Sequence, residues 1–179
     1  MFASTLRPGL ELRLLEIGHV PALYALCEKN RARLRRFLPW IEKTHGEADV
    51  RTFVEGALRQ FADGLGFHAG IFSEGELAGC IGMHPISRDN ASVSLGYWLD
   101  EDFEGRGIIT DAVRSVTHHC FVTLGLHRVE IRCSTANERS CAIPRRLGFH
   151  FEGTLRHAQK LPDGFTDINV FSKLSSDES

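Results

Sequence analysis

The sequence predicts one mixed α/β domain, of the α+β kind, with about seven strands in a mostly antiparallel sheet. Two observations carry this prediction. Apolar residues recur at helical spacing in some segments and alternate in others, in the order β-α-α-β-β-β-α-β-α-β-β. The 179 residues can bury one core, and no repeat or linker interrupts the order. We therefore expect a single domain at 1–175 and a polar tail at 176–179.

The first half of the chain combines one strand, two helices and three further strands. The expected elements are a strand at 10–16, helices at 21–30 and 47–64, two strands within 67–86 around a Glu74-Gly75 turn, and a strand at 92–99. The helix at 47–64 is the clearest, because its apolar residues follow the i, i+3, i+4, i+7 rule from Val50 to Phe61. The strand at 92–99, SVSLGYWL, alternates apolar with small or polar residues, apart from Trp98.

The second half alternates helices and strands before a closing pair of strands. The expected elements are a helix from Ile109 to Leu124, a strand at 127–134, a short helix from about Asn137 to Leu147, and strands near 149–158 and 165–174 around the turn LPDG. Pro144 has no N–H for the carbonyl of Ser140, so the short helix should kink there.

Composition excludes several classes of protein. A net charge of -2 gives no basic excess for nucleic acid, and the basic run RARLRRFLPW reads as a solvated or substrate-facing helix surface. The first residues, MFASTLRPGLELRLLE, show no long apolar run and no cleavage signature, so we expect neither a signal peptide nor a membrane span. The five cysteines show no C-x-x-C spacing, which favours free, mostly buried thiols in a reducing cytoplasm. We expect no metal site, since the neighbours His118 and His119 point about 100° apart on a helix.

The stretch FEGRGIIT, at 103–110, places two glycines before a helical pattern. Such a turn presents free backbone N–H groups to an anion, and glycine lets the anion approach. A Rossmann turn is excluded, because Thr110 stands where the third glycine would be, and a P-loop is excluded because no lysine follows. An ordinary strand-to-helix turn stays open on these eight residues alone.

Two longer segments decide between these alternatives. GYWLDEDFEGRGIIT, followed about thirty residues later by NERSCAIPRRLGF, resembles the GCN5-related N-acetyltransferase superfamily. The likeness is greatest to its Rim-type (RimL/RimJ-like) branch, which acetylates the N-terminal amine of ribosomal proteins. It runs from LELRLLE through PWIEK to the closing strands. Glu104 and Ile109 depart from the first and last positions of the cofactor motif Q/R-x-x-G-x-G/A, and Gly107 matches.

The resemblance implies an acetyl-CoA-dependent enzyme without a metal. Helices would lie on both faces of a sheet that splits in a V between the fourth and fifth strands, at 92–99 and 127–134. Pantetheine would lie in this gap beside Trp98 and Leu99, where a backbone amide would hold the thioester oxygen. The coenzyme diphosphate would bind backbone amides, and the residues implied for it are Arg106, Gly107, Ile108, Ile109 and Thr110.

The same resemblance assigns further roles around the gap. Asn137 would contact pantetheine and Ser140 would donate to the coenzyme sulfur, although Asn137 is also a good helix N-cap. Apart from the resemblance, the basic pair leads us to expect Arg145 or Arg146 at the 3′-phosphate of the nucleotide, and a solvated position for whichever points away. Trp40 and Trp98 would form part of the wall of an acceptor groove.

The general base is not identified by the resemblance. Rim-type enzymes that modify serine termini use a glutamate where this chain has Gln159, which cannot accept a proton. Candidates among the other residues are His157, His84 and the acidic run Asp100-Glu101-Asp102. An α-amino group has a pKa of about 7.7–8.0, so about a tenth of it is already neutral at pH 7. It therefore depends less on a general base for its deprotonation than a lysine amine does.

We therefore expect a cytoplasmic N-acetyltransferase that acts on a protein N-terminus, assembles as a homodimer or larger homo-oligomer, and binds neither nucleic acid nor membrane. Two alternatives stay open. One is acetylation of a small amine such as a polyamine, an aminoglycoside or an amino acid. The other is a non-catalytic acyl-CoA sensor.

Overall fold

The helices and strands of the protein follow the apolar patterns of its sequence. The computed structural model describes residues 3–177. Its main elements are β1 (Ala3–Arg7), β2 (Leu10–Leu14), α1 (Val20–Leu34), α2 (Glu47–Ala62), β3 (His68–Ser73), β4 (Glu76–Met83), β5 (Ser92–Leu99), α3 (Ile108–Val122), β6 (Arg128–Ser134), α4 (Glu138–Arg146), β7 (His150–Leu161) and β8 (Gly164–Leu174). Short 3-10 turns lie at Ile17–His19, Pro39–Lys43, Glu101–Phe103 and Ser175–Asp177.

One sheet holds eight strands in the order β1-β2-β3-β4-β5-β6-β8-β7. Every neighbouring pair is antiparallel except β5 and β6. The prediction of a mixed, mostly antiparallel sheet is confirmed, but its count of seven strands is one short. The missed strand is β1, which is an edge strand without a buried residue and therefore carries no strong apolar pattern.

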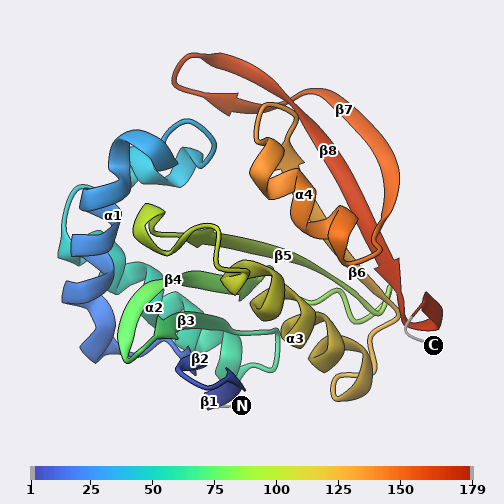
Figure 1. Cartoon of the computed structure of the whole chain (residues 1–179), viewed down its shortest axis with the longest axis horizontal. Helices are drawn as coiled ribbons and strands as arrows, with labels where there is room; N and C mark the ends of the chain where they lie inside the picture. The colour runs from blue at the N-terminus through green and yellow to red at the C-terminus, as the bar shows by residue number, and fades with distance from the viewer. Residues whose placement is uncertain (1–2, 178–179) are drawn as a thin grey trace.

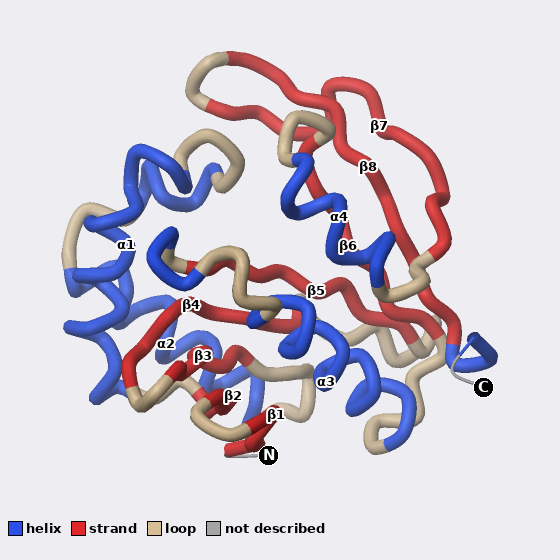
Figure 2. The backbone as a smooth tube through the Cα atoms, viewed as in Figure 1, coloured by secondary structure: helices blue, strands red, loops and turns tan. Residues whose placement is uncertain are grey.

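The helices cover both faces of the sheet (Figures 1 and 2). Helix α3 packs on one face, where its buried residues, including Val113 and Val116, join Leu12 and Ile71 of the strands. Helices α1 and α2 cover the opposite face around Phe72, Leu77 and Cys80. None of the helices in the described chain is long and apolar enough to span a membrane.

Strands β5 and β6 separate partway along their length. They pair in parallel from Ser92 and Arg128 to Leu95 and Ile131. Beyond that point β5 stays with β4 as far as Leu99, whereas β6 stays with β8 as far as Ser134. The predicted V-shaped split is thus present between the predicted segments, which are the fifth and sixth strands because β1 precedes them.

Gly79 lets the end of β5 lie close against β4. A Cβ atom at this position would lie 2.3 Å from the carbonyl oxygen of Trp98 and 2.9 Å from the Cα of Leu99. Both atoms belong to the backbone, so any larger residue would have to displace Trp98 and Leu99. This close contact fixes the strand end that borders the split.

Two element boundaries differ from the sequence prediction. Helix α1 continues four residues past Asn30, because Leu34 in its last turn is buried. Strand β7 is longer than expected and carries two register shifts, between Phe151 and Gly153 and between Leu155 and Gln159. Such bulges break the strict alternation on which the sequence prediction relied.

Candidate functional site

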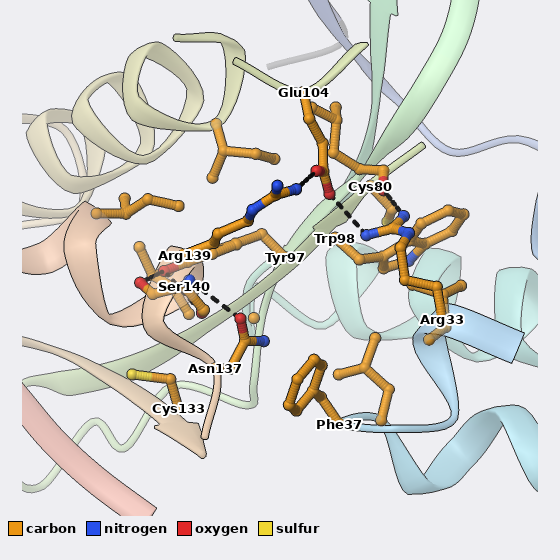
Figure 3. A pocket seen from close by; sticks show the side chains of 18 of the residues that line it. Arg33, Phe37, Cys80, Tyr97, Trp98, Glu104, Cys133, Asn137, Arg139 and Ser140 are labelled. Carbon is orange, nitrogen blue, oxygen red and sulfur yellow. Dashed lines mark hydrogen bonds and ion pairs between the residues drawn. The ribbon is translucent and has the colours of Figure 1, made fainter. Parts of the chain in front are cut away.

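A cavity of about 1690 Å³ crosses the sheet through the split between β5 and β6. Its walls come from both faces of the sheet (Figure 3). Alternate residues of β5 divide between the faces, since Tyr97 contacts α4 and Trp98 packs on the clusters beneath α1. We call the side towards α3 and α4 the cofactor face and the side towards α1 and α2 the acceptor face, after the roles that the family resemblance implies for them.

The glycine turn forms one wall of the cofactor face. Gly105 and Gly107 both have left-handed backbones, with φ of 76° and 73°. Gly107 is the N-cap of α3, so the first amides of this helix have no partner within it. A Cβ atom on either glycine would meet nothing within 4 Å, which leaves open space in front of the turn. The turn therefore has the shape and polarity that an anion requires.

The five residues predicted to hold a diphosphate do not all face the cavity. Gly107, Ile108, Ile109 and Thr110 line it. Arg106 is not among the residues that line it, and its guanidinium donates to the carbonyl of Asp102 at 2.8 Å and lies over the ring of Phe103.

Of the two adjacent arginines, only Arg146 lines the cavity. Its Nη1 donates to Thr110 Oγ1 at 2.9 Å. The guanidinium of Arg145 instead lies over the ring of Phe171, at 5.6 Å. Of this pair, the structure therefore places Arg146, and not Arg145, at the cofactor face.

A chain of ion pairs crosses the cavity just before the glycine turn. The two carboxylate oxygens of Glu104 accept from Arg33 of α1, at 2.8 Å, and from Arg139 of α4 (Figure 3). Arg33 also donates to the carbonyl of Leu99, and its Nε is buried without a partner. Glu104 replaces the glutamine or arginine of the family motif, and the structure shows it holding two arginines at the rim.

Ser140, Asn137 and Tyr97 meet where α4 begins. Asn137 is the N-cap of α4 and its Oδ1 accepts the Ser140 amide at 3.2 Å. Because Pro144 lacks an N–H, the Ser140 carbonyl instead accepts the Tyr97 hydroxyl at 3.2 Å. Ser140 Oγ lies 3.5 Å from the same hydroxyl, and all three residues line the cavity.

Tyr97 is a site residue that the sequence analysis missed. Burial raises the pKa of its phenol, so it stays a proton donor at neutral pH. The sequence signal for it was available, because the alternation of β5 places Tyr97 and Trp98 on opposite faces. Only one of the two can therefore face α4.

Trp98 and Trp40 form an aromatic wall on the acceptor face. Their ring centroids lie 6.1 Å apart at 48°, and Trp40 is half-exposed. Leu99 lines the cavity at the end of the same strand and is 8% exposed. Trp98 thus stands on the acceptor side and Leu99 at the crossing between the two faces.

Gln159 and Phe37 meet across the acceptor side of the cavity. Gln159 Nε2 donates to the Phe37 carbonyl at 2.8 Å, which joins the β7–β8 hairpin to the loop after α1. Both residues line the cavity. Figure 1 shows the hairpin tip arching towards this loop. The side chain at 159 therefore acts as a donor in this structure, which a carboxylate could not do.

The base candidates named from sequence lie in different surroundings. His84 lines the cavity, together with His68, which sequence reasoning had not considered. Burial and the neighbouring His84 lower the pKa of His68 to about 4. His157 does not line the cavity, because its ring stacks on Phe165 at 6.1 Å.

In the acidic run, Asp100 and Asp102 form ion pairs, whereas Glu101 and Asp102 line the cavity. Asp100 is 1% exposed and accepts from Lys29 at 2.6 Å and from Asn30 at 3.0 Å. Burial alone would raise the pKa of Asp100, but these two donors outweigh burial and hold it below its usual value. Asp102 also pairs with Lys29. Within residues 3–177 no group of three metal-ligating side chains comes together.

Comparison with known proteins gives this geometry a family. The profile of the acetyltransferase (GNAT) domain matches residues 9–150. The chain belongs to the GNAT acetyltransferase family. It is an acetyl-CoA-dependent N-acetyltransferase. The open glycine turn, the split strands and the unpartnered Arg33 Nε are features that suit an anionic, extended co-substrate.

Individual relatives match over nearly their full length. The chain is 35% identical over 166 residues to the ribosomal-protein-serine acetyltransferase of Escherichia coli K12, covering 93% of each protein. It is 34% identical to the putative ribosomal N-acetyltransferase YdaF of Bacillus subtilis, covering 97% of this chain and 96% of YdaF.

A solved structure matches the fold of this acetyltransferase closely. RimL, a ribosomal L7/L12 alpha-N-protein acetyltransferase in complex with coenzyme A, superposes with a TM-score of 0.94 at 30% identity. The match covers 98% of this chain and 99% of RimL. In that complex the coenzyme forms a disulfide with a cysteine of RimL.

Proposed function

We propose that this enzyme acetylates the N-terminal α-amino group of a protein, most simply a ribosomal protein. The main observation behind this proposal is the cavity that crosses the sheet at the β5–β6 split. It joins the glycine turn and Ser140 on one face to Trp40 and Trp98 on the other. A cofactor and an acceptor entering from opposite faces would meet at Leu99.

The cofactor face carries the groups that its co-substrate requires. Acetyl-CoA supplies the activated acetyl group. The amides at the start of α3, from Gly107 to Thr110, would bind its diphosphate, and Arg146 would lie beside its nucleotide phosphate. Asn137 would position the pantetheine arm. Ser140 would donate a proton to the departing sulfur, while an amide near Leu99 would stabilise the negative charge on the acyl oxygen.

The acceptor face favours an amine that is easily deprotonated. Position 159 offers no carboxylate to act as a base, since Gln159 stands there and its amide donates to the Phe37 carbonyl. An α-amino group, with a pKa of about 7.7–8.0, offers a useful neutral fraction without a strong base, whereas lysine at about 10.4 does not. The two homologues that carry ribosomal substrates in their names support the same acceptor class. A ribosomal acceptor would place the enzyme in the cytoplasm.

The experiment is a thiol-release assay with acetyl-CoA and three acceptors. The first is a peptide with a free N-terminal serine. The second is the same peptide with a blocked N-terminus and one lysine, and the third is spermidine. We expect coenzyme A release with the free N-terminus at a kcat/KM at least tenfold above the other two. Release with spermidine alone would support a small-amine enzyme, and binding of acetyl-CoA without release would support a sensor.

We also propose a homodimer built on the β7–β8 hairpin. Strand β7 is the edge of the sheet, and the hairpin exposes three large apolar side chains, Phe151, Leu155 and Phe165. Exposed apolar side chains on an unpaired edge favour association. Sedimentation equilibrium should give twice the chain mass for the parent protein and a monomer for Phe165→Asp. A monomeric parent would refute this assembly.

A further inference from the structure

Two buried cysteines meet behind the cofactor face. Cys133, near the end of β6, and Cys141, in the first turns of α4, place their sulfur atoms 2.9 Å apart. A disulfide bond is 2.03–2.05 Å long, so the two atoms need to approach by only about 1 Å. Both cysteines are free thiols. The pair can therefore be oxidised without a large rearrangement of strand or helix.

The two sulfurs differ in their access to the cavity. Cys133 lines the cavity, as does Ser140, which is adjacent to Cys141 in the chain. Cys141 is 1% exposed and lies behind Cys133. A sulfur brought to Ser140 by the cofactor would therefore meet Cys133 first. This step of the argument rests on the proposed position of the cofactor.

The surroundings of Cys141 favour its role as the second nucleophile. Its sulfur receives the Asn169 amide at 3.6 Å in addition to the contact with Cys133. Its thiol also donates to the Ser134 carbonyl at 3.5 Å, and these contacts hold the sulfur next to Cys133. Burial raises the pKa of the Cys133 thiol, so thiolate at Cys133 is scarce and the first exchange should be slow.

We propose that Cys133 and Cys141 form a dithiol that exchanges with disulfides of coenzyme A bound at the cofactor face. In the first step the Cys133 thiolate attacks one sulfur of coenzyme A disulfide. The S–S bond breaks, and one coenzyme A leaves as a thiolate that takes up the proton lost by Cys133. A mixed disulfide between Cys133 and the second coenzyme A remains.

In the second step the Cys141 thiolate attacks Cys133 Sγ. The bond from Cys133 to the coenzyme breaks, and the second coenzyme A leaves and takes up the proton lost by Cys141. The protein pair is oxidised by two electrons, and one coenzyme A disulfide is reduced to two thiols. Cys141 thus clears the active site of a covalently bound cofactor.

The test uses the reduced full chain, mixed with coenzyme A disulfide without oxygen. Free coenzyme A is quantified by chromatography and the protein by intact mass. The parent should release two coenzyme A per chain and lose the mass of two hydrogens. Cys141→Ser should release one and keep one coenzyme A as an adduct, and Cys133→Ser should release none. Cys27→Ser, a cavity-lining cysteine on the acceptor face, is the matched control and should behave as the parent.

Several outcomes would overturn the proposal. One is a stable coenzyme A adduct on the parent protein. Another is the release of only one coenzyme A per chain by Cys27→Ser. Glutathione disulfide should react at least tenfold more slowly, and excess acetyl-CoA should slow the exchange. If the two disulfides react at equal rates and acetyl-CoA does not slow the exchange, the cysteine pair reacts independently of the cofactor face.

Two further measurements keep the result interpretable. Thermal unfolding should show that each serine variant is folded. Calorimetry with acetyl-CoA on the same samples separates the two proposals. If acetyl-CoA binds and no exchange occurs, the dithiol proposal fails while the proposed function stands. If acetyl-CoA does not bind, the assignment of the cofactor face fails as well.

Discussion

Gln159 is the residue at which the chain and its family resemblance disagree most directly. A glutamate here could act as a base, whereas the glutamine amide donates to the Phe37 carbonyl at 2.8 Å. A carboxylate would place negative charge against a carbonyl oxygen and lose the bond. The physical role of position 159 in this protein is therefore to join the hairpin to the loop after α1.

We expect Gln159→Glu and Gln159→Ala to raise KM for an acceptor peptide by a similar factor of about three to ten, since both remove the donor, which is worth about 1 kcal/mol. Their kcat values should differ by less than threefold. Steady-state kinetics with a serine-terminated peptide provides the measurement. If the glutamate variant exceeds the alanine variant tenfold in kcat, position 159 is a base position and the bond to Phe37 is incidental.

Ser140 is the residue on which the proposed chemistry depends most. An expelled thiolate resembles cysteine, with a pKa near 8.5, and can leave unaided but more slowly. Ser140→Ala should therefore lower kcat by roughly a hundredfold, at the low end of general-acid effects, and leave acetyl-CoA affinity nearly unchanged. Ser115→Ala, on α3 outside the cavity, is the matched control. Turnover of the Ser140 variant within threefold of the parent would remove the serine from the mechanism.

At the scale of elements, the two ends of helix α3 differ in that one borders the cavity and the other does not. Gly107 caps its N-terminus and Gly125 follows its C-terminus, with φ of 73° and 64°. A Cβ atom added at either position would have no neighbour within 4 Å. The same substitution therefore imposes a similar backbone strain at both ends, but only the N-terminal end borders the cavity.

Gly107→Ala and Gly125→Ala should each destabilise the protein by about 1–2 kcal/mol, because both place an L-residue in the left-handed region. Only Gly107→Ala should weaken acetyl-CoA binding, by at least tenfold, since its Cβ would stand before the amides of α3. Urea unfolding and calorimetry measure the two effects separately. Equal acetyl-CoA affinity in the two variants would mean that the glycine turn does not bind the diphosphate.

The elements also show what could be read from sequence and what could not. The helices, the hairpin turn at Glu74-Gly75 and the strands at 92–99 and 127–134 were predictable, because the period of the apolar residues and the positions of the glycines encode them locally. Strand β1 was not, because its pairing with β2 is decided by backbone bonds at a sheet edge. Nor was the direction of Arg145 and Arg146, since a helix of nine residues with Pro144 inside it gives no reliable face.

At the scale of the whole molecule, the site depends on contacts far apart in sequence. Glu104 joins arginines of α1 and α4, and Gln159 joins the last hairpin to the loop after the first long helix. Such pairs have no local pattern, so sequence reasoning located the cofactor motif and missed the groups that close the cavity. The family resemblance supplied the V-shaped split, and the alternation along β5 could have supplied Tyr97.

The stability of the whole molecule should depend on the protonation of His68. In the unfolded chain this imidazole takes up a proton near pH 6.5, whereas in the fold burial and His84 lower its pKa to about 4. Between these values the unfolded state binds more protons, so falling pH favours unfolding. The stability contribution is fully present above pH 6.5 and is lost as the pH falls towards 4.

The free energy of unfolding should therefore fall by about 2–3 kcal/mol more in the parent than in His68→Gln between pH 7.5 and 4.5. Urea unfolding at the two pH values provides the measurement, and it needs no cofactor or acceptor. His150→Gln, which removes an exposed histidine of β7, is the control and should keep the parent's pH dependence. A parent and a His68 variant that lose stability in parallel would show that His68 takes up its proton without cost in the folded protein, and that the cavity wall beside it is already open to water.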